Sequence, residues 1–210
     1  MAKTKPFDEH FEDYEKWFDL NKAAYESEIR AIKHFIPDKG LGVEIGIGSG
    51  LFAAPLGITR GVEPSFQMRR MTRERGLKVT DGVAENIPLE SDCYDYVLMV
   101  TTVCFVENLA QSLKEVRRVL RTGGSVIIGF VDRESRIGKA YQANKQVSRF
   151  YKEAKFYSAG EIEQELKNAG FKHVEFVQTL FGSLKDLNEV QKFEAGHGEG
   201  SFVVVKAQKR

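Results

Sequence analysis

The stretch LGVEIGIGSG, residues 41–50, places an apolar run directly before three glycines at alternate positions, Gly46, Gly48 and Gly50. An apolar run of this length that ends in glycine predicts a buried strand followed by a loop. Glycine allows positive φ angles and lets a ligand approach the backbone closely. The short helix expected next, which Pro55 interrupts, supplies free N–H groups at its start. The stretch therefore predicts a site for an anion or a nucleotide-like ligand.

The alternation of strand and helix patterns continues as far as residue 132. Apolar segments predict five strands, at residues 41–48, 59–64, 77–82, 94–102 and 125–132. Helical patterns between them cover residues 65–76 and 108–124. Such alternation indicates βαβ units and a parallel sheet. Beyond it we expect a helix over residues 158–170 and two closing strands at 171–181 and 201–208. The N-terminal residues 7–36 show helical spacing, with a break near Asn21.

Composition limits the classes of protein to which this chain can belong. Its 210 residues suit one domain, and the charged residues nearly cancel, at a net charge of +1. A balanced charge favours neither nucleic acid nor a membrane surface as a partner, and no apolar run approaches the roughly 20 residues that span a bilayer. Residues 1–17 lack the apolar core of a secretory signal, and Cys93 and Cys104 make neither a disulfide scaffold nor a zinc site. We therefore expect a cytoplasmic protein.

Spacing around the glycines separates the kinds of nucleotide site. The phosphate-binding pattern GxxxxGK[ST] is absent, and the dinucleotide pattern GxGxxG fails because Leu51 stands where its third glycine would be. Glu44, two residues before the first glycine, would repel a pyrophosphate and suits a ligand that carries an ammonium group or another positive charge. Glu63 ends the second strand, 17 residues after Gly46. An acid at that place can accept two hydrogen bonds from a ribose diol.

Five motifs in register resemble one family. VEIGIGSG, GVEPS, DGVAENIPL, YDYVLMVTT and LRTGGSVIIG, which begin at residues 43, 61, 81, 94 and 120, are similar to the motifs of class I S-adenosylmethionine-dependent methyltransferases of the small-molecule type. The resemblance implies an α/β fold with a Rossmann-like, doubly wound sheet of seven strands, mostly parallel with an antiparallel C-terminal strand. It also implies a single methyltransferase domain (1–210) with four parts: an N-terminal helical lid (1–38), a cofactor-binding core (41–132), a helical substrate-side insertion (133–170) and a closing strand pair (171–210).

The resemblance further implies S-adenosyl-L-methionine as the cofactor and a role for each matched residue. The three glycines would wrap the methionine part, Glu44 would hold the loop and reach the amino group, and Glu63 would bind the ribose hydroxyls. The other implied cofactor contacts are Pro64, Met68, Ala84 and Glu85 near the adenine, and Thr101 and Thr102 near the methyl group and the methionine chain. Such sequences often carry Asp at the position of Val83, so we expect backbone groups or Glu85 to recognise the adenine amino group.

The chemistry of methyl transfer requires few protein groups. A sulfonium methyl group is already activated, so positioning and desolvation can supply most of the catalysis, and a general base helps only when the acceptor must lose a proton. We therefore assign no catalytic residue, and we expect no metal because no acid closes the fourth strand. Residues 101–108, TTVCFVEN, lack the Asn/Asp-Pro-Pro-aromatic motif of enzymes that methylate the amino groups of nucleic-acid bases. An N or O atom of a small molecule remains as the predicted acceptor.

Two segments outside the motifs are candidates for the acceptor pocket, and they indicate opposite substrate charges. Residues 7–29 hold eight acids, two lysines and several aromatic residues, a combination that suits a cationic amine. Residues 133–155 hold seven bases and two acids, which would suit an anionic acceptor. The candidate substrate contacts are Tyr14 and Trp17 in the first segment, and Tyr141 in the second, where Phe150 and Tyr151 would complete a wall. The sequence leaves both charges open.

Three other functions stay open at this point. The first is an NAD-dependent oxidoreductase, which Glu44 and the missing third glycine disfavour. The second is a protein that binds S-adenosylmethionine without turnover. The third is an RNA or protein methyltransferase that uses the basic segment 133–155. No pattern in the sequence indicates an oligomeric state.

Overall fold

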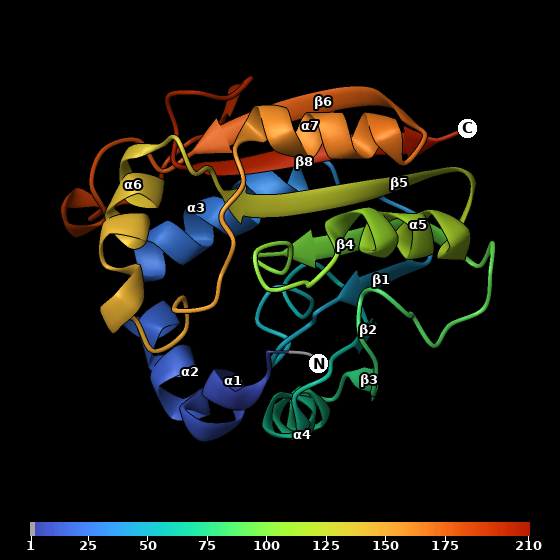
Figure 1. Ribbon diagram of the computed structural model, residues 1–210, viewed down its shortest axis with the longest axis horizontal. Helices are drawn as coiled ribbons and strands as arrows, with labels where there is room; N and C mark the ends of the chain where they lie inside the picture. The colour runs from blue at the N-terminus through green and yellow to red at the C-terminus, as the bar shows by residue number, and fades with distance from the viewer. Residues whose placement is uncertain (1–2) are drawn as a thin grey trace.

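The computed structural model describes residues 3–210, and one eight-stranded sheet with the order β3-β2-β1-β4-β5-β8-β6-β7 forms its centre (Figure 1). The strands are β1 (Gly42–Ile45), β2 (Arg60–Val62), β3 (Lys78–Thr80), β4 (Tyr94–Val100), β5 (Leu120–Val131), β6 (Phe171–Thr179), β7 (Glu194–Ala195) and β8 (Phe202–Lys209). Strands β1 to β5 are parallel, whereas β8 runs antiparallel between β5 and β6. The predicted doubly wound sheet with an antiparallel C-terminal strand is confirmed, and the two-residue β7 adds an eighth strand that the sequence pattern missed.

The strand order creates a ligand crevice at one edge of the sheet. The chain runs from β1 outward to β2 and β3, and then returns past β1 to β4. The connections that leave β1 and β4 therefore diverge, and open α/β sheets bind ligands outside the carboxyl ends of such neighbouring strands. Gly46 follows β1 and Thr101 follows β4, so that the glycine loop and the predicted methyl-facing residues meet at this edge.

Helices cover both faces of the sheet. They are α1 (Lys5–Glu9), α2 (Phe11–Leu20), α3 (Lys22–Lys33), α4 (Phe66–Glu74), α5 (Leu109–Val119), α6 (Arg136–Ala143) and α7 (Ala159–Asn168), with short 3-10 turns η1 (Lys145–Val147) and η2 (Leu184–Asp186). Helices α5 and α7 lie on one face and α3 lies on the other (Figure 1). Successive residues of β4 enter opposite cores: Val97 and Met99 pack with α5 and α7, and Leu98 packs with α3, as the two-residue period of a strand requires.

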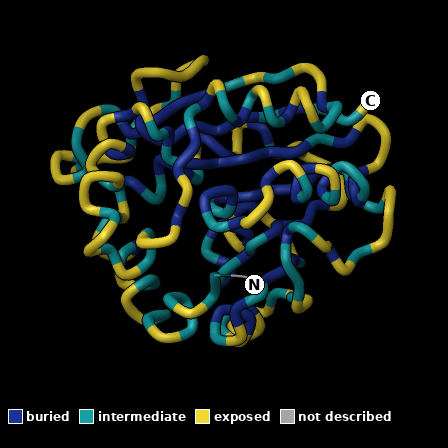
Figure 2. The backbone as a smooth tube through the Cα atoms, in the orientation of Figure 1, coloured by how far each residue is buried: buried dark blue, intermediate teal, exposed yellow. Residues whose placement is uncertain are grey.

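The buried layer follows the sheet, and the exposed residues lie mainly on the helices and loops around it (Figure 2). No helix within residues 3–210 is long and apolar enough to cross a membrane.

Local interactions define the ends of two helices. Ser65 accepts a backbone N–H at the start of α4, and Ser158 forms a capping box with Glu161 at the start of α7. Gly76 and Gly170, which follow these helices, have φ angles of +79° and +85°. Both glycines therefore end their helices in the left-handed region, where glycine carries no Cβ penalty.

The structure differs from the sequence prediction at three places. The helix expected over residues 108–124 ends at Val119, and residues 120–124 already belong to β5. The short helix expected after the glycine loop is absent, and residues 51–57 form successive turns. Pro55 has no N–H for a helical hydrogen bond, and Gly57 adopts a φ of +73°. The N-terminal segment forms three helices rather than two, because a break at His10 accompanies the expected break at Asn21. The predicted lid begins at residues 1–2, which lie outside the described residues.

Candidate active site

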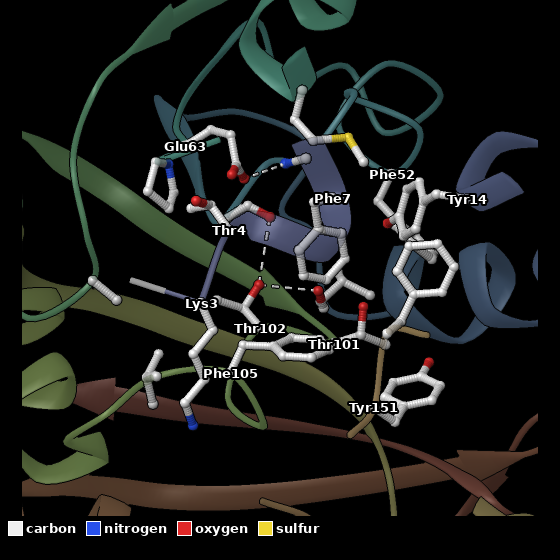
Figure 3. A pocket seen from close by; sticks show the side chains of 18 of the residues that line it. Lys3, Thr4, Phe7, Tyr14, Phe52, Glu63, Thr101, Thr102, Phe105 and Tyr151 are labelled. Carbon is white, nitrogen blue, oxygen red and sulfur yellow. Dashed lines mark hydrogen bonds between the residues drawn. The ribbon is translucent and has the colours of Figure 1, made fainter. Parts of the chain in front are cut away.

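A cavity of about 410 Å³ lies at the carboxyl ends of β1 and β4 and reaches beneath the N-terminal helices. The loops that follow β1, β2, β3 and β4 line one part of it, and residues of α1, α2, α3 and the segment 141–151 line the rest. Figure 3 shows side chains from both parts, including Glu63, Thr102, Tyr14 and Tyr151, around the same space. The volume falls in the range of small-molecule sites.

The glycine loop follows β1, and its three glycines serve different purposes. All have positive φ angles: +72° at Gly46, +57° at Gly48 and +88° at Gly50. A Cβ on Gly46 would lie 2.5 Å from the side chain of Thr102, and a Cβ on Gly50 would lie 2.7 Å from Leu77. A Cβ on Gly48 would meet only the Tyr14 hydroxyl, at 3.6 Å. Gly46 and Gly48 line the cavity, whereas Gly50 does not. A side chain at Gly50 would meet residues at the end of α4 and just beyond it, and its predicted contact with the cofactor stays a prediction.

Glu63, at the end of β2, ties the glycine loop to the start of α4. One carboxylate oxygen accepts the Gly48 N–H at 2.9 Å, and the other accepts the Ser65 N–H at 2.8 Å. Burial raises the pKa of Glu63 to about 7, although the two backbone N–H groups and the nearby Arg69 act in the opposite direction. Each carboxylate oxygen has two lone pairs, so Glu63 can still accept further hydrogen bonds from the cavity, which it lines.

Glu44 lies beneath the loop rather than in the wall of the cavity. Its side chain is 1% exposed, and one of its carboxylate oxygens, Oε2, has no hydrogen-bond partner. Burial and the neighbouring Glu63 raise its pKa well above the usual value, and a backbone hydrogen bond from Ala53 only partly offsets this. The structure therefore places Glu44 where it supports the loop, and its predicted contact with the cofactor's amino group stays a prediction.

The predicted adenine contacts surround one end of the cavity. Pro64, Met68, Ala84 and Glu85 all line it, as does Val83. The Glu85 carboxylate accepts the backbone N–H groups of residues 107 and 108, at 2.7 and 3.2 Å, and so connects the loop after β3 to the loop after β4.

The two threonines that follow β4 also line the cavity. Thr101 has a φ of +49°, which is a costly conformation for a residue with a branched Cβ. The hydroxyl of Thr102 lies within hydrogen-bond distance of three backbone oxygens, those of Ile45, Gly46 and Val100, at 3.2, 3.4 and 3.1 Å. Thr102 thus binds the end of β4 to the beginning of the glycine loop.

Aromatic side chains form the rest of the wall. The three predicted substrate contacts, Tyr14 and Trp17 on α2 and Tyr141 on α6, all line the cavity. Burial raises the pKa of Tyr14 and of Tyr141 above the usual value for a phenol, so both hydroxyls are neutral near pH 7. Phe150 and Tyr151 also line the cavity, and Tyr151 stacks on Tyr141 with ring centroids 5.0 Å apart.

Phe7, Phe105 and Glu28 are among the lining residues that the sequence analysis missed. Phe7 packs edge-on against Phe105 at 5.0 Å, although 98 positions separate the two residues. Their helical or loop context carries no signal of this contact, because it depends on where α1 docks. Asp8 anchors α1 by accepting the Ser65 hydroxyl at 2.7 Å.

No group of three or more His, Cys, Asp and Glu residues within 3–210 is arranged to hold a metal ion.

Comparisons with known proteins identify the family. The model of the methyltransferase domain family matches residues 43–128. An uncharacterised protein of Methanocaldococcus jannaschii is 44% identical over 205 residues, which are 97% of this chain and 98% of that protein. The crystal structure of an S-adenosylmethionine-dependent methyltransferase from Thermotoga maritima, described as a possible histamine N-methyltransferase, is 45% identical, with a TM-score of 0.96 over 98% of this chain and 99% of that one. The chain belongs to the S-adenosylmethionine-dependent methyltransferases.

A more distant structure shows the same fold with the cofactor bound. Phosphoethanolamine N-methyltransferase 2 of Haemonchus contortus, in complex with S-adenosyl-L-methionine, has a TM-score of 0.63 at 19% identity, over 87% of this chain and 52% of that one. This protein is an enzyme, and its cofactor is S-adenosyl-L-methionine. The cavity suits that cofactor, because the open backbone at Gly48 and the remaining acceptor capacity of Glu63 face the same space.

Proposed function

We propose that the enzyme transfers a methyl group to a nitrogen or oxygen atom of a small molecule held in the cavity. The observation that carries this proposal is the continuity of the cavity, which runs from the glycine loop into a space lined by aromatic side chains of α1, α2, α6 and the segment 150–151. Its volume of about 410 Å³ lies in the range of small-molecule sites.

The residues that line the cavity have separable roles in this proposal. Gly46 and Gly48 let the methionine part approach the backbone, Glu63 accepts the ribose hydroxyls, and Pro64, Met68, Ala84 and Glu85 surround the adenine. Residues 1–38 act as the lid. Bound S-adenosylmethionine supplies an activated methyl group, so no protein nucleophile is required. Thr101 and Thr102 shape the space where the acceptor approaches, and the aromatic wall excludes water from it.

The names of relatives support nitrogen as the acceptor atom. The protein from Thermotoga maritima is described as a possible histamine N-methyltransferase, and the one from Haemonchus contortus is a phosphoethanolamine N-methyltransferase. Oxygen stays in the proposal because a malonyl-[acyl-carrier protein] O-methyltransferase of Methylococcus capsulatus is 25% identical over 163 residues.

The basic segment does not favour an RNA or protein substrate. None of the seven bases in residues 133–155 lines the cavity. Arg133 forms ion pairs with Glu134 and Glu161, and Arg149 pairs with Asp13 on α2. Part of the positive charge is therefore used within the fold, where it fastens the insertion to its neighbours.

The test is a turnover assay with S-adenosylmethionine and a panel of small amines, alcohols and phenols, followed by mass spectrometry of the products. We expect formation of S-adenosylhomocysteine together with a product that is heavier by one methylene unit. Methylation of RNA or protein with no turnover of any small molecule would refute the proposal. Binding of S-adenosylhomocysteine with no turnover on any substrate would instead indicate a protein that binds the cofactor without catalysis.

A further inference from the structure

Glu28 on α3 is a buried acid without a partner. Its side chain is 4% exposed, and it lines the cavity. The other buried acids within residues 3–210 are Glu44, Glu63 and Asp132, and each accepts at least one backbone N–H. Within the same residues, no hydrogen bond or ion pair reaches Glu28. A buried carboxyl group without a hydrogen-bond partner costs stability whether or not it is ionised, so the packing of the protein alone does not explain this side chain.

Three phenol side chains, those of Tyr14, Tyr141 and Tyr151, line the same cavity as Glu28. The nearby titratable groups are Tyr14 on α2, Tyr25 on α3, Tyr141 on α6 and Tyr151, and the charge of Glu28 contributes to a raised pKa for each of them. All four are therefore neutral near pH 7, and none neutralises the carboxylate. Aromatic faces attract cations, most strongly where water is excluded.

The charges along the cavity also favour a cation. Five acids and one base line it, and the base, Lys3, donates to the backbone oxygen of Glu153 at 3.0 Å. Among those acids, Asp13 pairs with Arg149, and Glu63 and Glu85 accept backbone N–H groups. Glu28 is thus a carboxylate within the aromatic wall whose hydrogen-bonding capacity is unused. An anionic acceptor would be repelled there, and an ammonium group would complete the site.

We infer that Glu28 recognises a cationic amine acceptor: its carboxylate pairs with an ammonium group of the acceptor while the neighbouring aromatic rings contact the same cation. This inference rests on the proposed function, because it places the acceptor in the part of the cavity beyond the glycine loop. It chooses between the two acceptor charges that the sequence left open. The acidic N-terminal segment contributes the recognition residue, and the basic segment 133–155 contributes only aromatic side chains to the wall.

Three probes of one shape and different charge test the inference: 2-phenylethylamine, 2-phenylethanol and phenylacetate. Each is titrated by calorimetry at pH 8 into the wild-type enzyme saturated with S-adenosylhomocysteine, and into the Glu28→Gln and Glu26→Gln variants. Glu26 is the matched control, because it lies on the same helix and forms only an exposed ion pair with Lys22.

We expect the wild-type enzyme to bind the amine more tightly than the alcohol and to reject the carboxylate. Glu28→Gln should weaken binding of the amine roughly 10- to 100-fold, the usual effect of removing a charged hydrogen-bond partner. It should leave the affinities for 2-phenylethanol and S-adenosylhomocysteine unchanged, and Glu26→Gln should change none of them. The unchanged S-adenosylhomocysteine affinity also shows that the variant is folded.

Two results overturn the assignment of Glu28 while the proposed function stands. In the first, wild-type enzyme binds the amine no better than the alcohol. In the second, Glu28→Gln binds the amine as tightly as wild type does. Failure of the proposed function is a different observation, namely that no small acceptor of any charge is methylated by enzyme that binds S-adenosylhomocysteine.

Discussion

Replacing Glu28 by Gln should stabilise the enzyme, and the gain should grow with pH. Burial raises the pKa of Glu28 from the usual 4.5 to about 8, so the folded protein binds this proton more tightly than the unfolded chain does. The wild type therefore loses stability as pH rises from about 4.5 toward 8. The raised pKa lowers the free energy of unfolding of the wild type by about 3 kcal/mol at pH 7 and by about 5 kcal/mol above pH 9. Gln carries no charge and escapes this loss.

The measurement is urea unfolding of the wild type and of Glu28→Gln at pH 5, 7 and 9, without S-adenosylhomocysteine. Taking the difference between the two proteins cancels the titrations of Glu44 and Glu63, whose pKa values are also raised by burial. The free energy of unfolding should be similar for both proteins at pH 5, and Glu28→Gln should be more stable at pH 9. A difference that stays constant from pH 5 to 9 would show that Glu28 is solvated or paired, and would refute the reasoning.

Three further predictions concern the cofactor site and the fold. Gly46→Ala should lower the affinity for S-adenosylhomocysteine, measured by calorimetry, at least tenfold, because the added Cβ would lie 2.5 Å from Thr102. Gly57→Ala is the control: its φ of +73° is similar, nothing lies within 4 Å of the added Cβ, and the affinity should be unchanged. The affinity of the wild type for S-adenosylhomocysteine should fall as pH decreases below about 7, the pKa of Glu63, by up to about tenfold per pH unit. Glu63→Gln should remove that pH dependence. A variant with the same pH profile as the wild type would contradict the role of Glu63 in binding the ribose. Ser158→Ala removes the capping box of α7 and should lower the free energy of unfolding by about 1 kcal/mol, measured by urea, with no change in S-adenosylhomocysteine affinity.

Much of the candidate site around the glycine loop could be predicted because its signals are local. Strands can be recognised in a sequence from apolar runs and from the turn residues that bound them. Gly46, Gly48 and Glu63 lie at such strand ends, so their positions could be predicted. Glu44 shows the limit of this reasoning. Its position before the loop was clear from the sequence, but only the folded chain reveals that its carboxyl is buried beneath the loop and does not line the cavity.

The aromatic part of the candidate site depends on contacts between distant segments. Phe7 and Phe105 meet across 98 positions, and Tyr14 on α2 reaches Phe150, with ring centroids 6.0 Å apart. Helical periodicity shows that residues share a face, but it cannot show which surface that face covers.

The charge of the cavity wall shows the same division most clearly. The sequence alone determined that the N-terminal segment is acidic, that residues 133–155 are basic, and that both contain aromatic residues. The tertiary structure decided which charges enter the cavity: Glu28 does, and the seven bases do not. The physical reason is that burial and pairing depend on the docking of α2, α3 and α6 around the sheet. Burial raises the pKa of a carboxyl group and leaves it without a partner only when that docking removes it from water.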